Sequence, residues 1–102
     1  MSGAGTELIR RRLLVNGVVQ GVGFRPFVYG LAHDEDLFGF VSNTSDGVII
    51  VVQGPADAVE RFAARLENEP PPLARVVSIA SEDLETIPTD AFLIVASDDT
   101  PG

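Results

Sequence analysis

The stretch VVQGVGFRP, residues 18–26, limits most strongly what this chain can fold into. Valines before it favour a strand, and two glycines separated by one residue allow a sharp backbone turn. Pro26 suits the first turn of a helix, where its missing N–H is not needed. The stretch therefore predicts a strand that passes into a helix through a glycine-rich loop, with a single arginine, Arg25, immediately before the proline.

The segments on either side of this loop have the periodicity that this prediction requires. Residues 8–19 alternate as a half-buried strand does. Apolar residues at positions 24, 27, 28 and 31 fall on one face of a helix. We expect this helix to stop near the run HDED at 33–36, because acidic side chains oppose the dipole at a helix C-terminus.

Further along, two short apolar strands are expected, LFGFVSN at 37–43 and GVIIVVQG at 47–54, joined by the tight-turn signal TSDG. Gly54-Pro55 then opens a second helix, which the proline run at 70–72 ends. The segments ARVVSIASEDL and DAFLIVAS predict two more strands. The buried stripe of the second helix is expected to contain Val59, Phe62, Ala63 and Leu66.

The resulting order is β-α-β-β-α-β with an extra or split strand near the end. Its simplest packing is a ferredoxin-like α+β sandwich, a mostly antiparallel sheet with two helices on one face. We expect residues 8–97 to form this one domain, and residues 1–7 and 98–102 to be disordered. This fold hosts many functions, so it does not by itself assign one.

Composition narrows the classes of partner. The 102 residues include 15 acidic and 7 basic side chains, for a net charge of −8, and all basic residues are arginine. Nucleic-acid binding through a broad basic surface is therefore disfavoured, and any bound anion must be held by local geometry. No cysteine is present, which excludes disulfides and thiolate metal sites. No signal peptide or long apolar run is visible, so a cytoplasmic protein is the default expectation.

The glycine-rich loop has two interpretations. It can be a phosphate cradle, because such a loop points several N–H groups into one concavity beside the positive end of a helix. Arg25 adds a planar, permanently charged fork that suits phosphate oxygens. Because a residue before proline avoids the α region, we expect Arg25 at the helix N-cap. The alternative is a purely structural turn from strand to helix.

Asn43 is the other candidate for a functional role, since it stands at the end of the second strand, which can lie near the first loop. Asparagine is also common in turns, so a plain turn residue remains the alternative. His33, beside acids near a helix end, is expected to be solvated or to cap the helix end rather than to be catalytic. The run HDED could suggest a divalent cation, but one contiguous run rarely supplies converging ligands. No metal site is predicted.

Two longer motifs, NGVVQGVGFRPFVYGLA and GFVSNTSDGVIIVVQGP, resemble those of the acylphosphatase family. With RPF and PPLARV they are most similar to the acylphosphatase-like N-terminal domain of carbamoyltransferases that mature nickel–iron hydrogenases. The resemblance covers about Arg10 to Ser97. Phe40 replaces a tryptophan frequent in the family, and Gly30 stands where arginine is more usual.

The resemblance implies hydrolysis of acyl phosphates, with carbamoyl phosphate as the substrate in the carbamoyltransferase branch and no cofactor. Arg25 would bind phosphate, and Asn43 would place the attacking water. The main-chain N–H groups of the loop would contact the phosphate, namely those of Gln20, Gly21, Val22, Gly23 and Phe24. The chain would be the first domain of a larger carbamoyltransferase, whose other domains would be its partners. The alternative is a domain that binds phosphate or a neighbouring domain without turnover.

Overall fold

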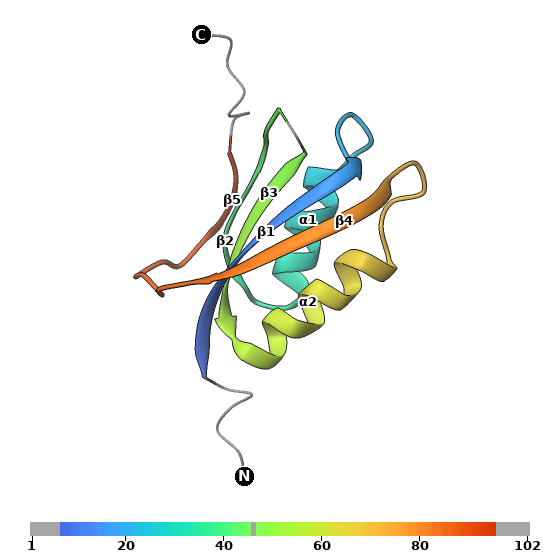
Figure 1. The fold of residues 1–102 in the computed structure, drawn as a ribbon. Coiled ribbons are helices and arrows are strands. Elements are labelled where there is room, and N and C mark those ends of the chain that lie inside the picture. Colours follow the sequence, from blue (N-terminus) through green and yellow to red (C-terminus); the bar gives the residue numbers. More distant parts are fainter. Residues whose placement is uncertain (1–6, 46, 96–102) are drawn as a thin grey trace, which may run out of the picture.

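The computed structural model describes residues 7–45 and 47–95 and has two layers, a five-stranded sheet and two helices on one of its faces (Figure 1). The elements in chain order are β1 (Leu8–Val18), α1 (Phe24–Asp34), β2 (Phe38–Asn43), β3 (Val48–Pro55), α2 (Ala56–Asn68), β4 (Arg75–Leu84) and β5 (Phe92–Ile94). The predicted α+β sandwich, including the additional strand, is confirmed. Disorder predicted at both termini lies outside the described residues, except at Glu7.

Strand order in the sheet is β4-β1-β3-β2-β5. All neighbouring strands are antiparallel except β2 and β5, which are parallel. The β1–β3 ladder ends where Val15 pairs with Val48. After Asn16 the register of β1 against β4 shifts, and Gly17 pairs with Val76. After Val15, β1 therefore pairs with β4 alone.

Apolar side chains that alternate along the strands form the core between the sheet and the helices. Leu13 and Val15 of β1 pair with Ile50 and Val48 of β3, and all four are buried. Helix residues complete the core, namely Phe24, Val28, Leu31, Ala32, Ala58, Val59, Phe62 and Leu66. Each large apolar side chain buried here stabilises the fold by about 1.5–3 kcal/mol. Ala63, predicted to be buried, is only half-buried.

The start of α1 differs from the prediction. Gly23, not Arg25, is the N-cap, and it adopts left-handed backbone angles of φ 77° and ψ 21°. Arg25 is therefore the second residue of the helix. Pro26 follows as the third residue, where its missing N–H falls among the first-turn donors that have no partner within a helix. A following proline disfavours helical backbone angles but does not forbid them, and Arg25 lies within the helix that Gly23 caps.

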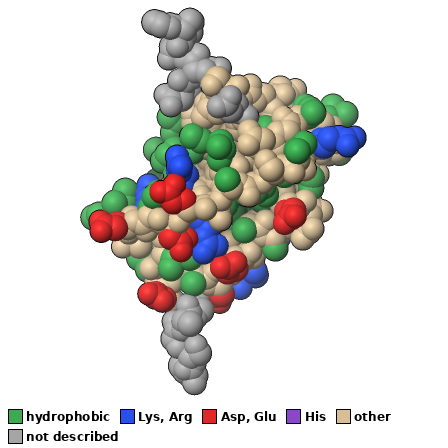
Figure 2. All heavy atoms as spheres, in the orientation of Figure 1, with side chains coloured by type: hydrophobic (Ala, Val, Ile, Leu, Met, Phe, Trp, Pro, Cys, Tyr) green, Lys and Arg blue, Asp and Glu red, His purple; other side chains and the backbone are tan. Residues whose placement is uncertain are grey.

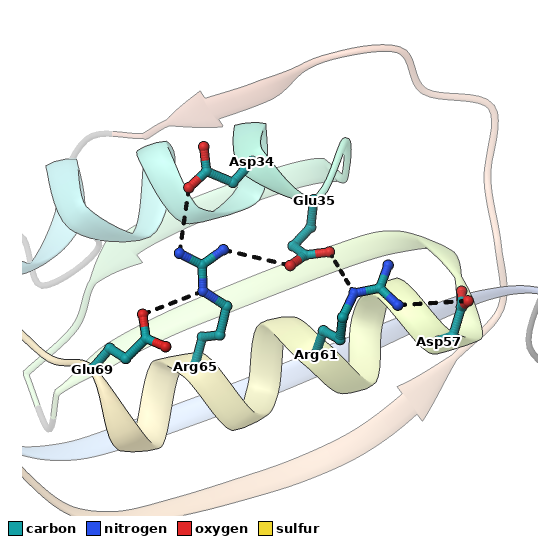
Figure 3. A network of polar contacts seen from close by, with 6 residues as sticks. All are labelled: Asp34, Glu35, Asp57, Arg61, Arg65 and Glu69. Carbon is teal, nitrogen blue, oxygen red and sulfur yellow. Dashed lines mark hydrogen bonds and ion pairs between the residues drawn. The ribbon is translucent and has the colours of Figure 1, made fainter.

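The acidic end of α1 is where it was expected, with Asp34 as its last residue. Asp34 and Glu35 accept hydrogen bonds from two arginines of α2, Arg61 and Arg65, and so join the two helices (Figure 3). These carboxylates are therefore engaged in ion pairs. Figure 2 shows acidic and arginine side chains lying side by side in the lower half of the view, with few charged side chains in its upper part.

Candidate functional site

Two glycines shape the loop between β1 and α1. Gly21 and Gly23 have φ values of 73° and 77°, a region that residues with a side chain rarely adopt. A Cβ atom added at either glycine would meet no atom within 4 Å. Backbone conformation, rather than crowding, is therefore what requires glycine at these two positions.

The N–H groups of this loop have no partner among the residues that the structure describes. Within the described residues, the main-chain N–H groups of Gly21, Val22, Gly23, Phe24 and Arg25 donate no hydrogen bond. The Phe24 side chain is buried in the core and Val22 packs against it, so these residues offer a ligand their main chain rather than their side chains. Unpaired N–H groups beside a helix N-terminus form an anion-binding arrangement.

Arg25 is half-buried in the first turn of α1. It makes no hydrogen bond or ion pair with any residue that the structure describes. No acidic residue occurs in the sequence between Glu7 and Asp34. The chain thus carries a local positive charge here despite its net charge of −8.

Asn43 ends β2 and pairs with Val48 of β3. Its side-chain Oδ1 atom is buried and accepts no hydrogen bond from the described residues. A buried acceptor without a partner costs about 1–3 kcal/mol, which makes this atom a candidate for binding water or a ligand.

Gln20 connects the two segments that hold these candidates. Its side-chain Nε2 donates hydrogen bonds to the main-chain oxygens of Thr44, at 2.6 Å, and of Gly47, at 2.8 Å. The β1–α1 loop and the β2–β3 tip consequently lie together at one end of the sheet (Figure 1). The sequence predicted a main-chain role for Gln20 and missed this side-chain bridge, which no local pattern signals.

A hollow of about 240 Å³ lies beside this bridge. It is lined by residues from the end of β1, the loop and the tip, namely Gly17, Val18, Val19, Gln20, Ser45 and Gly47. Neither Arg25 nor Asn43 lines it, so the roles assigned to those two side chains remain predictions. Asp46, in the predicted TSDG turn, lies outside the described residues.

The described residues contain no group of three or more histidine, cysteine or acidic side chains that could hold a metal ion. Neither α1 nor α2 has the length and apolar character that a membrane-crossing helix needs.

Known proteins share the sequence motifs and the fold of this chain. The acylphosphatase family model matches residues 11–94. The carbamoyltransferase HypF2 of Cupriavidus necator is 48% identical over 90 residues, which are 87% of this chain and 11% of that protein. An acylphosphatase of Caldivirga maquilingensis is 43% identical over 81 residues, 78% of this chain and 84% of that protein.

Solved structures show the same two kinds of relative. A full-length HypF in a phosphate- and nucleotide-bound form matches with a TM-score of 0.86 and 34% identity, over 95% of this chain and 13% of that one. The acylphosphatase of Bacillus subtilis matches with a TM-score of 0.81 and 36% identity, over 85% of this chain and 98% of that one.

The chain belongs to the acylphosphatase family. Within that family it is similar both to free-standing acylphosphatases and to the N-terminal domain of HypF carbamoyltransferases. It spans about a tenth of the length of the carbamoyltransferase relatives. Both parts of the resemblance found in the sequence motifs are thereby confirmed.

Proposed function

We propose that this domain hydrolyses acyl phosphates, and that its substrate is carbamoyl phosphate. The observation that carries the proposal is the buried Oδ1 atom of Asn43, which has no partner among the described residues and lies at the strand end that Gln20 connects to the loop. That loop has free N–H groups and an arginine without a partner among the described residues. Together these groups supply anion binding and a solvent-directing amide at one end of the sheet.

In this scheme Arg25 and the loop N–H groups hold the phosphoryl oxygens and stabilise the charge that they carry in the transition state. Asn43 accepts a hydrogen bond from water and aligns it for in-line attack. A bond forms from the water oxygen to phosphorus, and the bond from phosphorus to the acyl oxygen breaks. The leaving carbamate or carboxylate is already a stable anion and needs no general acid. The proton of the water passes to a phosphate oxygen.

The similarity to carbamoyltransferases suggests the larger protein in which this domain works. We infer that this domain works as the N-terminal part of a carbamoyltransferase that matures nickel–iron hydrogenase, and that the remaining domains of such a protein are its partners. Its 48% identity to a HypF2 supports this branch. A HypF relative in a phosphate-bound form supports a phosphorylated ligand.

Phosphate release from carbamoyl phosphate and from benzoyl phosphate tests the proposal. Purified, folded protein should release phosphate from carbamoyl phosphate with saturation kinetics. Benzoyl phosphate separates general acylphosphatase activity from a preference for the carbamoyl group. No release above background from either compound would refute hydrolysis, and binding of inorganic phosphate in that case would support the non-catalytic alternative.

A further inference from the structure

The side chain of Gln20 joins two segments that are distant in sequence. One Nε2 atom contacts the carbonyl oxygens of Thr44 and Gly47, which lie 24 and 27 residues away. Thr44 directly follows Asn43, and Gln20 directly precedes the glycine-rich segment of the loop. The amide group has two N–H donors, so one side chain can satisfy both carbonyls.

The position of this bridge matters because the ladder pairing between β1 and β3 stops just before it, where Gly47 packs against Val15. The β1–β3 ladder stops at Val15 and Val48, and the last residues of β1 pair with β4 instead. The β2–β3 tip is closed on itself by the Thr44 N–H, which donates to the Gly47 oxygen at 2.8 Å. The hydrogen bonds of Gln20 therefore connect the β2–β3 tip to the loop beyond the last pair of the β1–β3 ladder.

We propose that Gln20 is a positioning residue that holds the Asn43 strand end in register with the phosphate-binding loop. Its side chain acts through Asn43 and does not itself contact the reacting atoms. The inference rests on the proposed function, since it assigns Asn43 and the loop to the same reaction. Loss of the bridge should misplace the water-directing amide while it leaves the loop able to bind an anion.

The chain contains a matched control at the opposite end of β3. The side chain of Gln53 also bonds to main chain far away in sequence, donating to the Ile87 oxygen at 2.7 Å and accepting from the Ile87 N–H at 3.0 Å. Gln53 is buried, whereas Gln20 is exposed. Removal of the Gln53 amide should therefore destabilise the protein at least as much, without involving the site.

The experiment compares Gln20→Met with Gln53→Met, because methionine keeps the side-chain length and removes the amide. For carbamoyl phosphate hydrolysis we expect kcat to fall about tenfold in Gln20→Met, with KM changed less than about twofold, since misplacement of reacting groups lowers rate more than affinity. Gln53→Met should keep the kcat of the unaltered protein while its melting temperature falls. Equal kcat values in the two variants would overturn the inference, and an unaltered protein without turnover would instead count against the proposed function.

An NMR titration with inorganic phosphate decides the question without turnover. In the unaltered protein and in Gln53→Met, phosphate should shift the Gly21 and Gly23 N–H signals and the Asn43 side-chain amide signals over the same concentration range. In Gln20→Met only the loop signals should shift. If the Asn43 signals still shift in Gln20→Met as in the unaltered protein, the positioning role is refuted. A lack of any response in the unaltered protein would instead count against phosphate binding and so against the proposed function.

Discussion

Arginine does two different things in two regions of this molecule. Between the helices, arginines are surrounded by carboxylates in a network with six members (Figure 3): Asp34, Glu35, Asp57, Arg61, Arg65 and Glu69. At the loop, Arg25 has no such partner among the described residues. A hydrogen bond to Glu35 is the main cause that raises the pKa of Arg61 above its usual value.

The arginines of the network use their charge to hold the helices together, whereas the charge of Arg25 is available to a ligand. Each arginine of the network has its positive charge balanced locally, and its removal changes only how the helices are held together. Arg25 stands in a sequence segment without acidic residues, so its charge can be balanced only by something outside the described part of the chain. In a chain with net charge −8, an arginine of this kind next to unpaired loop N–H groups is suited to meet an anion.

The largest expected effect is that of Arg25→Ala. We expect carbamoyl phosphate turnover to fall about 10³-fold, and phosphate affinity to fall with it, because one group serves both binding and transition-state charge. Steady-state kinetics and a phosphate titration measure the two quantities. Arg61→Ala is the control and should keep normal turnover, and an equal loss in both variants would remove the distinction between the regions.

A smaller effect is expected for Asn43→Ala. Turnover should fall about 10²-fold while phosphate affinity stays within about threefold of normal, because alanine removes the water-directing amide and leaves the loop intact. The same kinetics and titration check this result. Parallel losses of rate and affinity, as in Arg25→Ala, would contradict the division of roles.

In the network, Glu35→Gln should affect stability and not activity. Glu35 contacts both Arg61 and Arg65, and its side chain is only 11% exposed, whereas the arginines are much more exposed. We expect the melting temperature to fall by about 3 °C at low salt, because both ion pairs of Glu35 are weakened. The fall is small because solvent screens such pairs. Thermal unfolding in about 1 M salt should reduce the difference, since screening shortens the range of the interaction. A changed kcat would mean that the two regions are coupled.

The smallest effect is expected for Asp57→Asn. Asp57 pairs with Arg61 one helical turn away at 3.6 Å, and both side chains are more than half exposed. Pairs of this kind add little to stability, so the melting temperature should change by less than about 1 °C. A loss as large as that of Glu35→Gln would show that this pair contributes more than its exposure suggests.

Elements with a local signal could be predicted from the sequence. Strand alternation, the helix stripes and the proline run were enough for the bounds of β2, β3 and α2 to be close to those observed. The N-cap of α1 was predicted at Arg25 and is Gly23, because the prediction rested only on the restriction before proline and the sequence does not show which glycine adopts left-handed angles. The segment at 90–97 was expected to be a longer strand than β5, which is only Phe92–Ile94 within the described residues.

Only part of the candidate site could be proposed from the sequence. Motif and backbone chemistry led to Arg25, Asn43 and the loop glycines, whose roles remain predictions. The Gln20 bridge could not, because it depends on where two distant segments meet after the sheet forms. The unpartnered state of Asn43 Oδ1 is likewise a property of the packed strand end and not of its neighbours in sequence.

The contact between the β2–β3 tip and β1 also depends on Gly47, a residue with no side chain. A Cβ atom there would lie 2.1 Å from the Val15 oxygen and 3.0 Å from Asn16 Oδ1. Even alanine would force the hairpin tip away from β1 and would strain the Gln20 bridge. In a library of all single substitutions selected for turnover, position 47 should therefore be as intolerant as the loop glycines, although Gly47 has no side chain that could take part in the reaction.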